Sequence, residues 1–232
     1  MILERHSECR VQKLNIGAEQ APLIVIDNFI ENAEALVLAA KSKAFVVTNR
    51  FFPGIRAKAP LQYQHFLLAE LKDTLVEHFN LPEGKMSFSM CHYSLVTTPA
   101  EKLAMIQRIP HIDSTEANGL ATVHYLFKGS LGGTAFYRHR KTGFEYIDES
   151  RQLDYFRSLE DENDGPNMPG SEYINGDTPL FERIAAQEGV FNRMLIYRRN
   201  SLHSGSIDAN FQPDPNPLTG RLSINSFIDL KS

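Results

Sequence analysis

The sequence is poor in cysteine: Cys9 and Cys91 are the only two among 232 residues. Two isolated cysteines cannot build the disulfide framework of a small secreted domain, and they are too few for a cysteine-based zinc site. Residues 1–6 contain no long apolar segment of the kind that a signal peptide requires. These absences predict a protein that works in the reducing cytoplasm.

Long apolar runs and an excess of charge are also absent. The longest aliphatic stretch, residues 35–40, is far too short to span a bilayer. A net charge of -4 gives no general attraction to nucleic acid or anionic membrane, so neither is an expected partner. A hydrophobic fraction of 42% and a charged fraction of 22% are typical of a soluble globular protein. We expect residues 1–232 to form one domain, and the sequence does not indicate its oligomeric state.

The first eighty residues contain one predicted strand and two predicted helices. The aliphatic run 23–26 predicts a buried strand, which a polar Asp-Asn pair ends. Residues 32–44 are rich in helix formers, and residues 62–79 place apolar side chains at helical spacing. Between these two helices, the prolines and glycine of residues 53–60 predict a loop.

Beyond residue 80 the pattern changes to that of a β protein. Short β-branched and aromatic segments, bounded by glycine and proline, predict strands at 86–96, 120–127, 134–137, 194–197 and 222–228. Residues 149–159 and 181–187 are predicted short helices, whereas residues 161–176 and 211–217 are predicted loops of the kind that often shapes a binding pocket. This succession predicts a mainly β, α+β protein with flanking helices, built as a β-sandwich or jelly roll.

The residues with the strongest chemical content are His111-Ile112-Asp113 and the distant His203. Residues i and i+2 of a strand point the same way, so His111 and Asp113 can bind one metal ion from one face. Two imidazoles and one carboxylate form the facial triad that holds non-haem Fe(II) and leaves coordination positions open. An HxD triplet alone is a weak signal, because it arises by chance and a lone histidine is often structural.

Several further segments occur in an order that resembles the 2-oxoglutarate- and Fe(II)-dependent oxygenase superfamily, in particular its prolyl-4-hydroxylase-like branch and little-studied bacterial relatives. The matching segments are Pro22–Phe29, His111–Asp113, Ala121–Leu126, Gly132–Phe136, His203–Gly205 and Arg221–Ser223. Together they extend over about residues 22–228. The order of these segments is more specific than any single motif.

The resemblance implies a double-stranded β-helix (a cupin-like jelly roll) with N-terminal helices packed on one sheet. It implies that His111, Asp113 and His203 bind Fe(II), with 2-oxoglutarate and O2 as co-substrates. The implied reaction hydroxylates a small molecule or an exposed amino-acid side chain and releases succinate and CO2. The carboxylate at position 113 favours hydroxylation, because halogenating relatives usually leave that position empty for halide.

The resemblance also implies that Arg221, Ser223 and Tyr125 hold the far carboxylate of 2-oxoglutarate. A guanidinium forms paired, charge-assisted hydrogen bonds with a planar carboxylate, and Ser223 shares the strand face of Arg221. Packing or strand pairing alone is the alternative role for these three residues. A proline-rich insert lengthens the segment between His203 and Arg221, which leaves three rival anchors: Arg193, Arg198 and Arg199.

Other side chains are ambiguous in the sequence. Tyr93 is a weaker candidate for lining the pocket, and His124 is expected to pack within its strand. Three phenylalanines could line an entrance, but core packing is the preferred interpretation for Phe45, Phe51 and Phe52.

Two other functional classes remain open from the sequence. The first is a jelly-roll protein that binds metal or 2-oxoglutarate, as a sensor or partner-binding module, without turnover. The second is a metal hydrolase or cupin-like isomerase that uses the same ligands and works without O2.

Overall fold

The computed structural model describes residues 1–163 and 165–231. The elements follow one another as β1 (Arg10–Ile16), β2 (Ala21–Asp27), α1 (Glu34–Lys41), β3 (Gly54–Lys58), α2 (Leu61–His78), β4 (Lys85–Val96), η1 (Ala100–Lys102), η2 (Met105–Gln107), β5 (Leu120–Tyr125), β6 (Gly133–His139), α3 (Glu149–Asn163), β7 (Phe181–Glu188), β8 (Met194–Arg198), β9 (His203–Ser206) and β10 (Leu222–Lys231).

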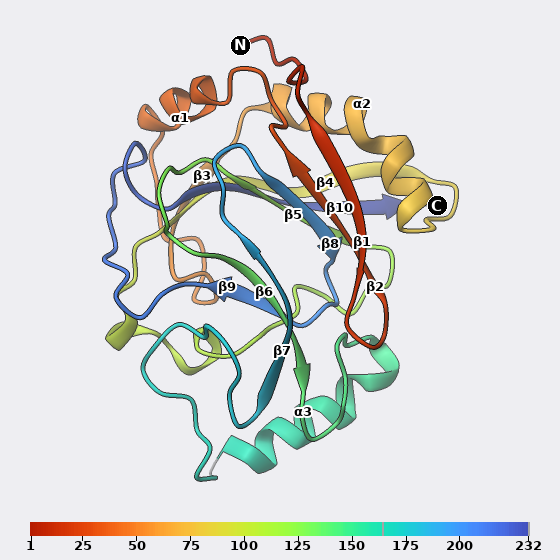
Figure 1. The fold of residues 1–232 in the computed structure, drawn as a ribbon, viewed down its shortest axis with the longest axis vertical. Coiled ribbons are helices and arrows are strands. Elements are labelled where there is room, and N and C mark those ends of the chain that lie inside the picture. Colours follow the sequence, from red (N-terminus) through yellow and green to blue (C-terminus); the bar gives the residue numbers. More distant parts are fainter. Residues whose placement is uncertain (164, 232) are drawn as a thin grey trace.

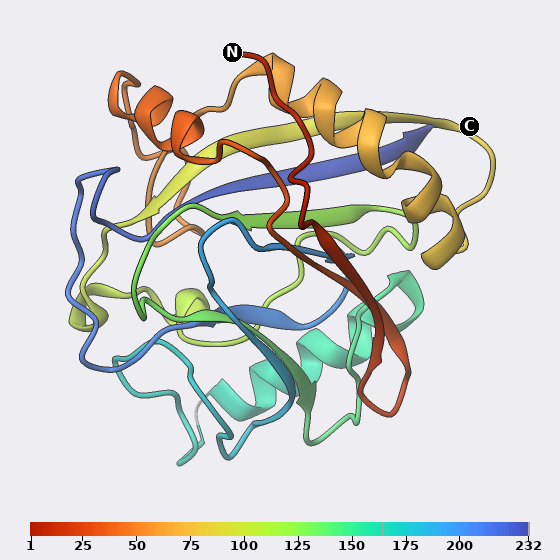
Figure 2. The same cartoon turned by 45° about the horizontal axis from the view of Figure 1, so that its top comes forward.

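The strands form two antiparallel sheets (Figures 1 and 2). The larger sheet has seven strands in the order β1-β2-β8-β5-β10-β4-β3, and the smaller sheet has three in the order β7-β6-β9. Neighbours in each sheet are often far apart in sequence, as in the pairing of β2 with β8 and of β10 with β4. The predicted mainly β class with a few helices is therefore confirmed.

Helices α1 and α2 lie against one face of the larger sheet (Figure 1). The buried residues of α2 recur every fourth position (Tyr63, Leu67, Leu71, Leu75), so one helix stripe packs into the core. Each fully buried leucine stabilises the fold by about 1.5–3 kcal/mol. The opposite face of the sheet packs on the smaller sheet, where Val25 and Leu195 of the larger sheet share an apolar cluster with Phe136 of β6.

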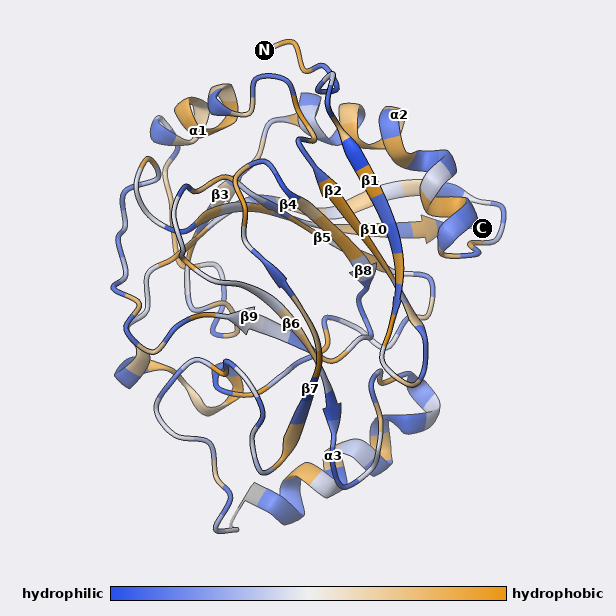
Figure 3. Cartoon of the chain, viewed as in Figure 1, coloured by the Kyte–Doolittle hydropathy of each residue, from blue (hydrophilic) through white to orange (hydrophobic). Residues whose placement is uncertain are grey.

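The hydropathy colouring of Figure 3 shows why some strands could be predicted from the sequence. Strands β2 and β8 are almost uniformly hydrophobic because both of their faces are covered, whereas β1 alternates along the sheet edge. The helices predicted at 32–44, 62–79 and 149–159 are α1, α2 and α3.

Four expectations need correction. Residues 181–187 form β7 rather than a helix, because antiparallel pairing with β6 overrides the helix preference of Ala185, Ala186 and their polar neighbours. The loop predicted at 53–60 contains the edge strand β3, and β9 was not predicted at all. The helices expected at the N-terminus come later, because two strands, β1 and β2, precede α1. Residue 164, in the predicted loop 161–176, lies outside the described residues.

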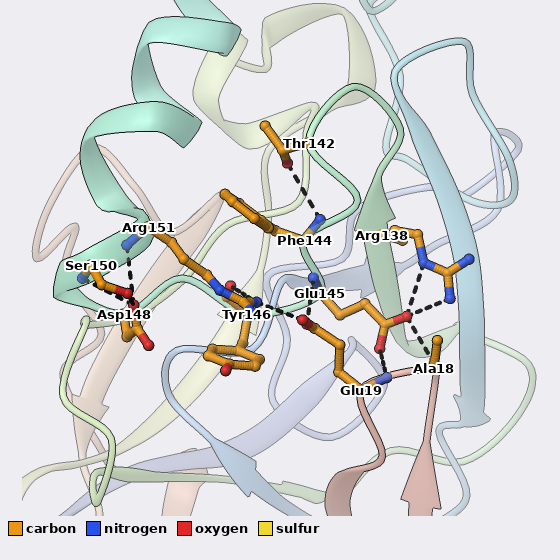
Figure 4. A network of polar contacts seen from close by, with 10 residues as sticks. All are labelled: Ala18, Glu19, Arg138, Thr142, Phe144, Glu145, Tyr146, Asp148, Ser150 and Arg151. Carbon is orange, nitrogen blue, oxygen red and sulfur yellow. Dashed lines mark hydrogen bonds and ion pairs between the residues drawn. The ribbon is translucent and has the colours of Figure 1, made fainter.

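A buried carboxylate joins the β1–β2 turn to the segment that leads into α3 (Figure 4). The Glu145 side chain is 0% exposed and accepts hydrogen bonds of 2.9 Å from the backbone amides of Ala18 and Glu19 and from Nε of Arg138. Glu19 in turn binds Nη1 of Arg151 in the first turn of α3 at 2.7 Å. Gly17 has φ +70°, and a Cβ there would stand 2.1 Å from the Glu145 carboxylate. The network therefore ties the first turn of α3 to the β1–β2 turn.

Replacing Glu145 with alanine is expected to lower the free energy of unfolding by about 3 kcal/mol, because two backbone amides and two donor groups of Arg138 lose a buried acceptor. Glu182 is the matched control: it also binds Arg138, at 2.8 Å, but its side chain is 40% exposed. Its replacement by alanine is expected to cost less than about 1 kcal/mol. Urea unfolding followed by circular dichroism measures both values. Equal losses of unfolding free energy in the two variants would show that burial of Glu145 adds nothing to the stability of the fold.

No helix among the described residues is long and apolar enough to cross a membrane.

Candidate metal centre and its cavity

The structure brings His111, Asp113 and His203 together. One ligand atom from each lies within 4.8 Å of the other two. Asp113 is central, since its two oxygens lie 3.9 Å from Nε2 of His111 and 3.5 Å from Nε2 of His203. Two neutral nitrogens and one carboxylate oxygen, all aimed at one point, fit a divalent transition metal with open coordination positions.

A reciprocal backbone contact sets the two histidines side by side. The amide of His111 donates to the carbonyl of His203 at 2.9 Å, and the amide of His203 donates back at 3.0 Å. This antiparallel bridge extends the smaller sheet beyond β9, whose His203 also pairs with Phe136 of β6. Asp113 lies outside a regular strand, and its amide donates to the carbonyl of Arg199 at 2.8 Å. The shared direction of the ligands therefore arises from pairing with residues 199–203.

The protonation states also suit a metal. His203 Nδ1 lies 2.9 Å from the carbonyl oxygen of Ser201, which can only accept a hydrogen bond. Nδ1 must carry the proton, so Nε2 presents its lone pair toward Asp113. Burial lowers the pKa of His203 to about 4, which keeps the imidazole neutral at physiological pH. Burial raises the pKa of Asp113, an effect that a bound cation would reverse.

The triad opens into a cavity of about 550 Å³ between the two sheets, within the range of small-molecule sites. Its lining combines the triad with side chains from β3, β10, α3 and the loops that precede β3 and His111. Among the described lining residues, Asp113 is the only acid, whereas Arg56 and Arg221 are both cationic. The cavity is therefore suited to anions.

Arg221 is a buried cation at this cavity. Its Nε and Nη2 donate to the carbonyl oxygens of Leu131 and Gly133, both at 2.8 Å, and these bonds fix the guanidinium. Within the described residues no carboxylate pairs with it, and burial lowers its pKa. Gly133 also lets β6 approach β7 closely, because a Cβ there would stand 1.9 Å from the carbonyl oxygen of Gln187. A buried, unpaired guanidinium is poised for an anionic ligand.

Ser223 and Tyr125 lie near Arg221 in different ways. Ser223 lines the cavity, and its hydroxyl donates to the amide oxygen of Asn225 at 2.7 Å. Tyr125 is fully buried and shares a hydrogen bond of 2.6 Å with the hydroxyl of Thr134. Thr134 rather than Tyr125 lines the cavity. The structure thus gathers Arg221, Ser223 and Tyr125 in one region, with Tyr125 behind Thr134.

The rival arginines are engaged elsewhere. Arg193 holds Asp27 with hydrogen bonds of 2.6 and 3.2 Å, and Arg199 binds Glu116 and Asp229. Arg198 donates to the backbone oxygens of Ala117 and Phe79. None of the three is among the described residues that line the cavity of the triad.

The ambiguous side chains are also placed. Tyr93 points to the helix-covered face, where its hydroxyl donates to the carbonyl of Leu36 at 2.9 Å. His124 is packed as expected, between the Tyr63 hydroxyl and the Asn192 side chain. Phe45 packs against the core, but Phe51 and Phe52 line the cavity, contrary to the preferred interpretation.

Sequence reasoning missed Arg56, Thr134 and Asn225 as cavity residues. Arg56 lay in a predicted loop, and its position follows from the pairing of β3 with β4, for which the sequence has no local signal. Period 2 from Arg221 and Ser223 pointed to Asn225, the next residue on the same face of β10.

Solved structures with a similar fold include HygX from Streptomyces hygroscopicus, determined with nickel and 2-oxoglutarate bound. It is 11% identical, with 92% of this chain and 84% of HygX covered and a TM-score of 0.53. The non-haem alpha-ketoglutarate-dependent epimerase SnoN from nogalamycin biosynthesis is 12% identical, with coverage of 91% and 78% and a TM-score of 0.52. No curated protein matches the chain.

The chain therefore shares its fold with these non-haem 2-oxoglutarate-dependent enzymes, and His111, Asp113 and His203 form a possible metal site in it. The chain belongs to the family described as a family of unknown function, DUF6445, which it matches over residues 7–228. The prolyl-4-hydroxylase-like branch stays a prediction.

Proposed function

We propose that the protein is a non-haem Fe(II)- and 2-oxoglutarate-dependent dioxygenase. It hydroxylates a small molecule or an exposed amino-acid side chain and releases succinate and CO2. The two sheets are the halves of a double-stranded β-helix. One observation carries the proposal: the same cavity is lined by a His-Asp-His triad and by a buried arginine that has no carboxylate partner within residues 1–163 and 165–231.

The residues divide the work between metal and co-substrate. His111, Asp113 and His203 would hold Fe(II), which supplies the activation of O2 when it is bound. Arg221 binds the far carboxylate of 2-oxoglutarate through guanidinium donors, and the hydroxyl of Thr134 is a further donor when Tyr125 donates to it. Ser223 becomes a donor to the same carboxylate when its hydroxyl turns away from Asn225. Tyr125 orients Thr134 through their 2.6 Å hydrogen bond.

Other residues fix the protonation state of the metal site and exclude water from the cavity. Ser201 fixes the tautomer of His203, so that no proton has to leave before a metal binds. Phe227 and Tyr197 form apolar parts of the wall, which restrict water around the reacting groups. Tyr155 and Leu159 of α3 close another side of the cavity.

The test is a stepwise titration. Anaerobic Fe(II) with 2-oxoglutarate is expected to give a weak visible charge-transfer band, and admission of air is then expected to yield succinate. Glutarate, which lacks the keto oxygen needed for chelation, is the matched control and should give neither signal. Iron binding without the band or succinate would instead support a binding or sensing protein. Turnover of a substrate without O2 would support a hydrolase or isomerase.

A further inference from the structure

A second arginine reaches the cavity from the edge of the larger sheet. Arg56 of β3 lies opposite Ser94 of β4, which lies opposite Ser223 of β10, which in turn lies opposite Tyr125 of β5. Residues opposite one another in antiparallel strands share a face, so Arg56 belongs to the same row as Ser223. It enters from β3, the last strand of the larger sheet on this side, two strands away from Ser223.

The Arg56 guanidinium is held in place by a hydroxyl and an aromatic ring. Its Nε donates to the hydroxyl of Ser94 at 3.2 Å, and its central carbon lies 4.2 Å from the centroid of the Phe52 ring. No carboxylate lies within ion-pair distance of it among the described residues. Burial lowers the pKa of Arg56, and the negative charge of Asp113 only partly offsets this effect. A stacked, partly desolvated guanidinium with free donors is prepared for an anion.

A neighbouring lysine adds positive charge at this edge of the larger sheet. Lys58, the next residue on the same face of β3, lies opposite His92. The Nδ1 atom of His92 is buried and has no hydrogen-bond partner among the described residues. The cavity lining offers no acid here, since its one described acid is Asp113 at the triad.

The charges of the loaded site leave Arg56 unbalanced. A ferrous dication, the Asp113 carboxylate, the dianion of 2-oxoglutarate and the Arg221 guanidinium cancel one another. Arg56 then remains as one positive charge in the cavity. A substrate with one negative charge restores the balance, which favours a carboxylate over a doubly charged phosphate.

The rest of the opening is apolar. Phe51, Ile106 and Phe156 line the cavity while their side chains stay 60%, 40% and 42% exposed. An exposed apolar rim of this kind marks a surface that a ligand covers. It suits the body of a substrate whose charged end reaches Arg56.

We propose that Arg56 is a specificity-determining residue that binds the carboxylate of an apolar carboxylic acid substrate. This proposal rests on the proposed function for the charge balance of the loaded site and for the chemistry that follows binding. The two ends of the site then have separate tasks, with Arg221 for the co-substrate and Arg56 for the substrate.

The experiment measures binding by calorimetry in protein loaded with Mn(II) and saturating 2-oxoglutarate, so that Arg221 is already occupied. The probes are phenylacetate, phenylbutyrate and phenyloctanoate, each compared with its neutral amide. At least one acid is expected to bind about 10- to 100-fold more tightly than its amide. Arg56→Gln is expected to remove this preference, and Arg56→Lys, which keeps the charge but loses the planar fork, is expected to restore part of it.

Arg157→Gln is the control, because this arginine is exposed on α3, and it should leave the preference intact. Unchanged affinity for 2-oxoglutarate in Arg56→Gln shows that this variant is folded. Three results would overturn the proposal: no acid binds, acid and amide bind equally, or Arg56→Gln weakens 2-oxoglutarate instead. If the wild-type protein binds no 2-oxoglutarate, the proposed function is wrong, but the proposal for Arg56 can still be tested. The acids and amides are then titrated into metal-free Arg56→Gln and Arg221→Gln, and the variant that loses the preference for the acid identifies the arginine that binds it.

Discussion

Replacing Asp113 with alanine is expected to abolish succinate formation and to weaken Mn(II) binding by more than about 100-fold. Loss of a residue that merely supports a metal ligand costs about 10- to 100-fold, and loss of the ligand itself costs more. Asp113 also supplies the single negative charge of the triad and lies between the two histidines. Calorimetry with Mn(II) and a succinate assay with Fe(II) measure the two effects.

The fold is expected to survive this change. Burial raises the pKa of Asp113, so the ionised carboxylate destabilises the metal-free fold at neutral pH, and its removal relieves that cost. Asp154→Ala, at an exposed position on α3, is the matched control and should leave metal binding and turnover unchanged. Succinate formation by Asp113→Ala would reject the triad as the metal site.

Replacing Arg221 with glutamine is expected to raise the 2-oxoglutarate concentration for half-maximal turnover by about 100-fold, with metal binding unchanged. The variant loses a buried charge-assisted contact, which is worth about 1.5–3 kcal/mol. The amide of glutamine can still reach one of the backbone oxygens that Arg221 satisfies, which limits the damage to the fold. Initial-rate measurements over a range of 2-oxoglutarate concentrations give the value.

The 2-oxoglutarate concentration for half-maximal turnover of Arg157→Gln gives the baseline. The value for Arg56→Gln shows whether Arg56 or Arg221 binds the co-substrate. A normal requirement in Arg221→Gln together with a raised one in Arg56→Gln would move the co-substrate anchor to β3. Arg193, Arg198 and Arg199 are less suitable anchors because their guanidinium groups already bind partners outside the cavity.

The buried strands could be predicted from the sequence because their two covered faces require nearly continuous apolar or β-branched residues. Strands β2, β5 and β8 follow this rule. Strand β9, with the sequence HSGS, has no such signal and exists because it pairs with β6. Strand β7 is rich in helix formers, so only its long-range partner determines its structure.

The candidate site divides in the same way. The triad could be proposed because its residue types and order are distinctive, although its geometry comes from pairing between residues 111 and 203 rather than from one strand. The distinction between Arg221 and Arg199 depends on acids that only the fold brings close, such as Glu116 and Asp229. Arg56 escaped prediction because the register of three strands places it in the cavity.

The reciprocal bridge between His111 and His203 makes resistance to proteolysis depend on the bound metal. A cation bound by both side chains would link the short strand β9 to the segment around His111. Its binding free energy would therefore add to the stability of the smaller sheet. Metal-free copies of the protein would then have a sheet edge that opens more readily to proteases. The supply of metal would therefore determine the lifetime of the folded protein as well as the fraction with a complete site.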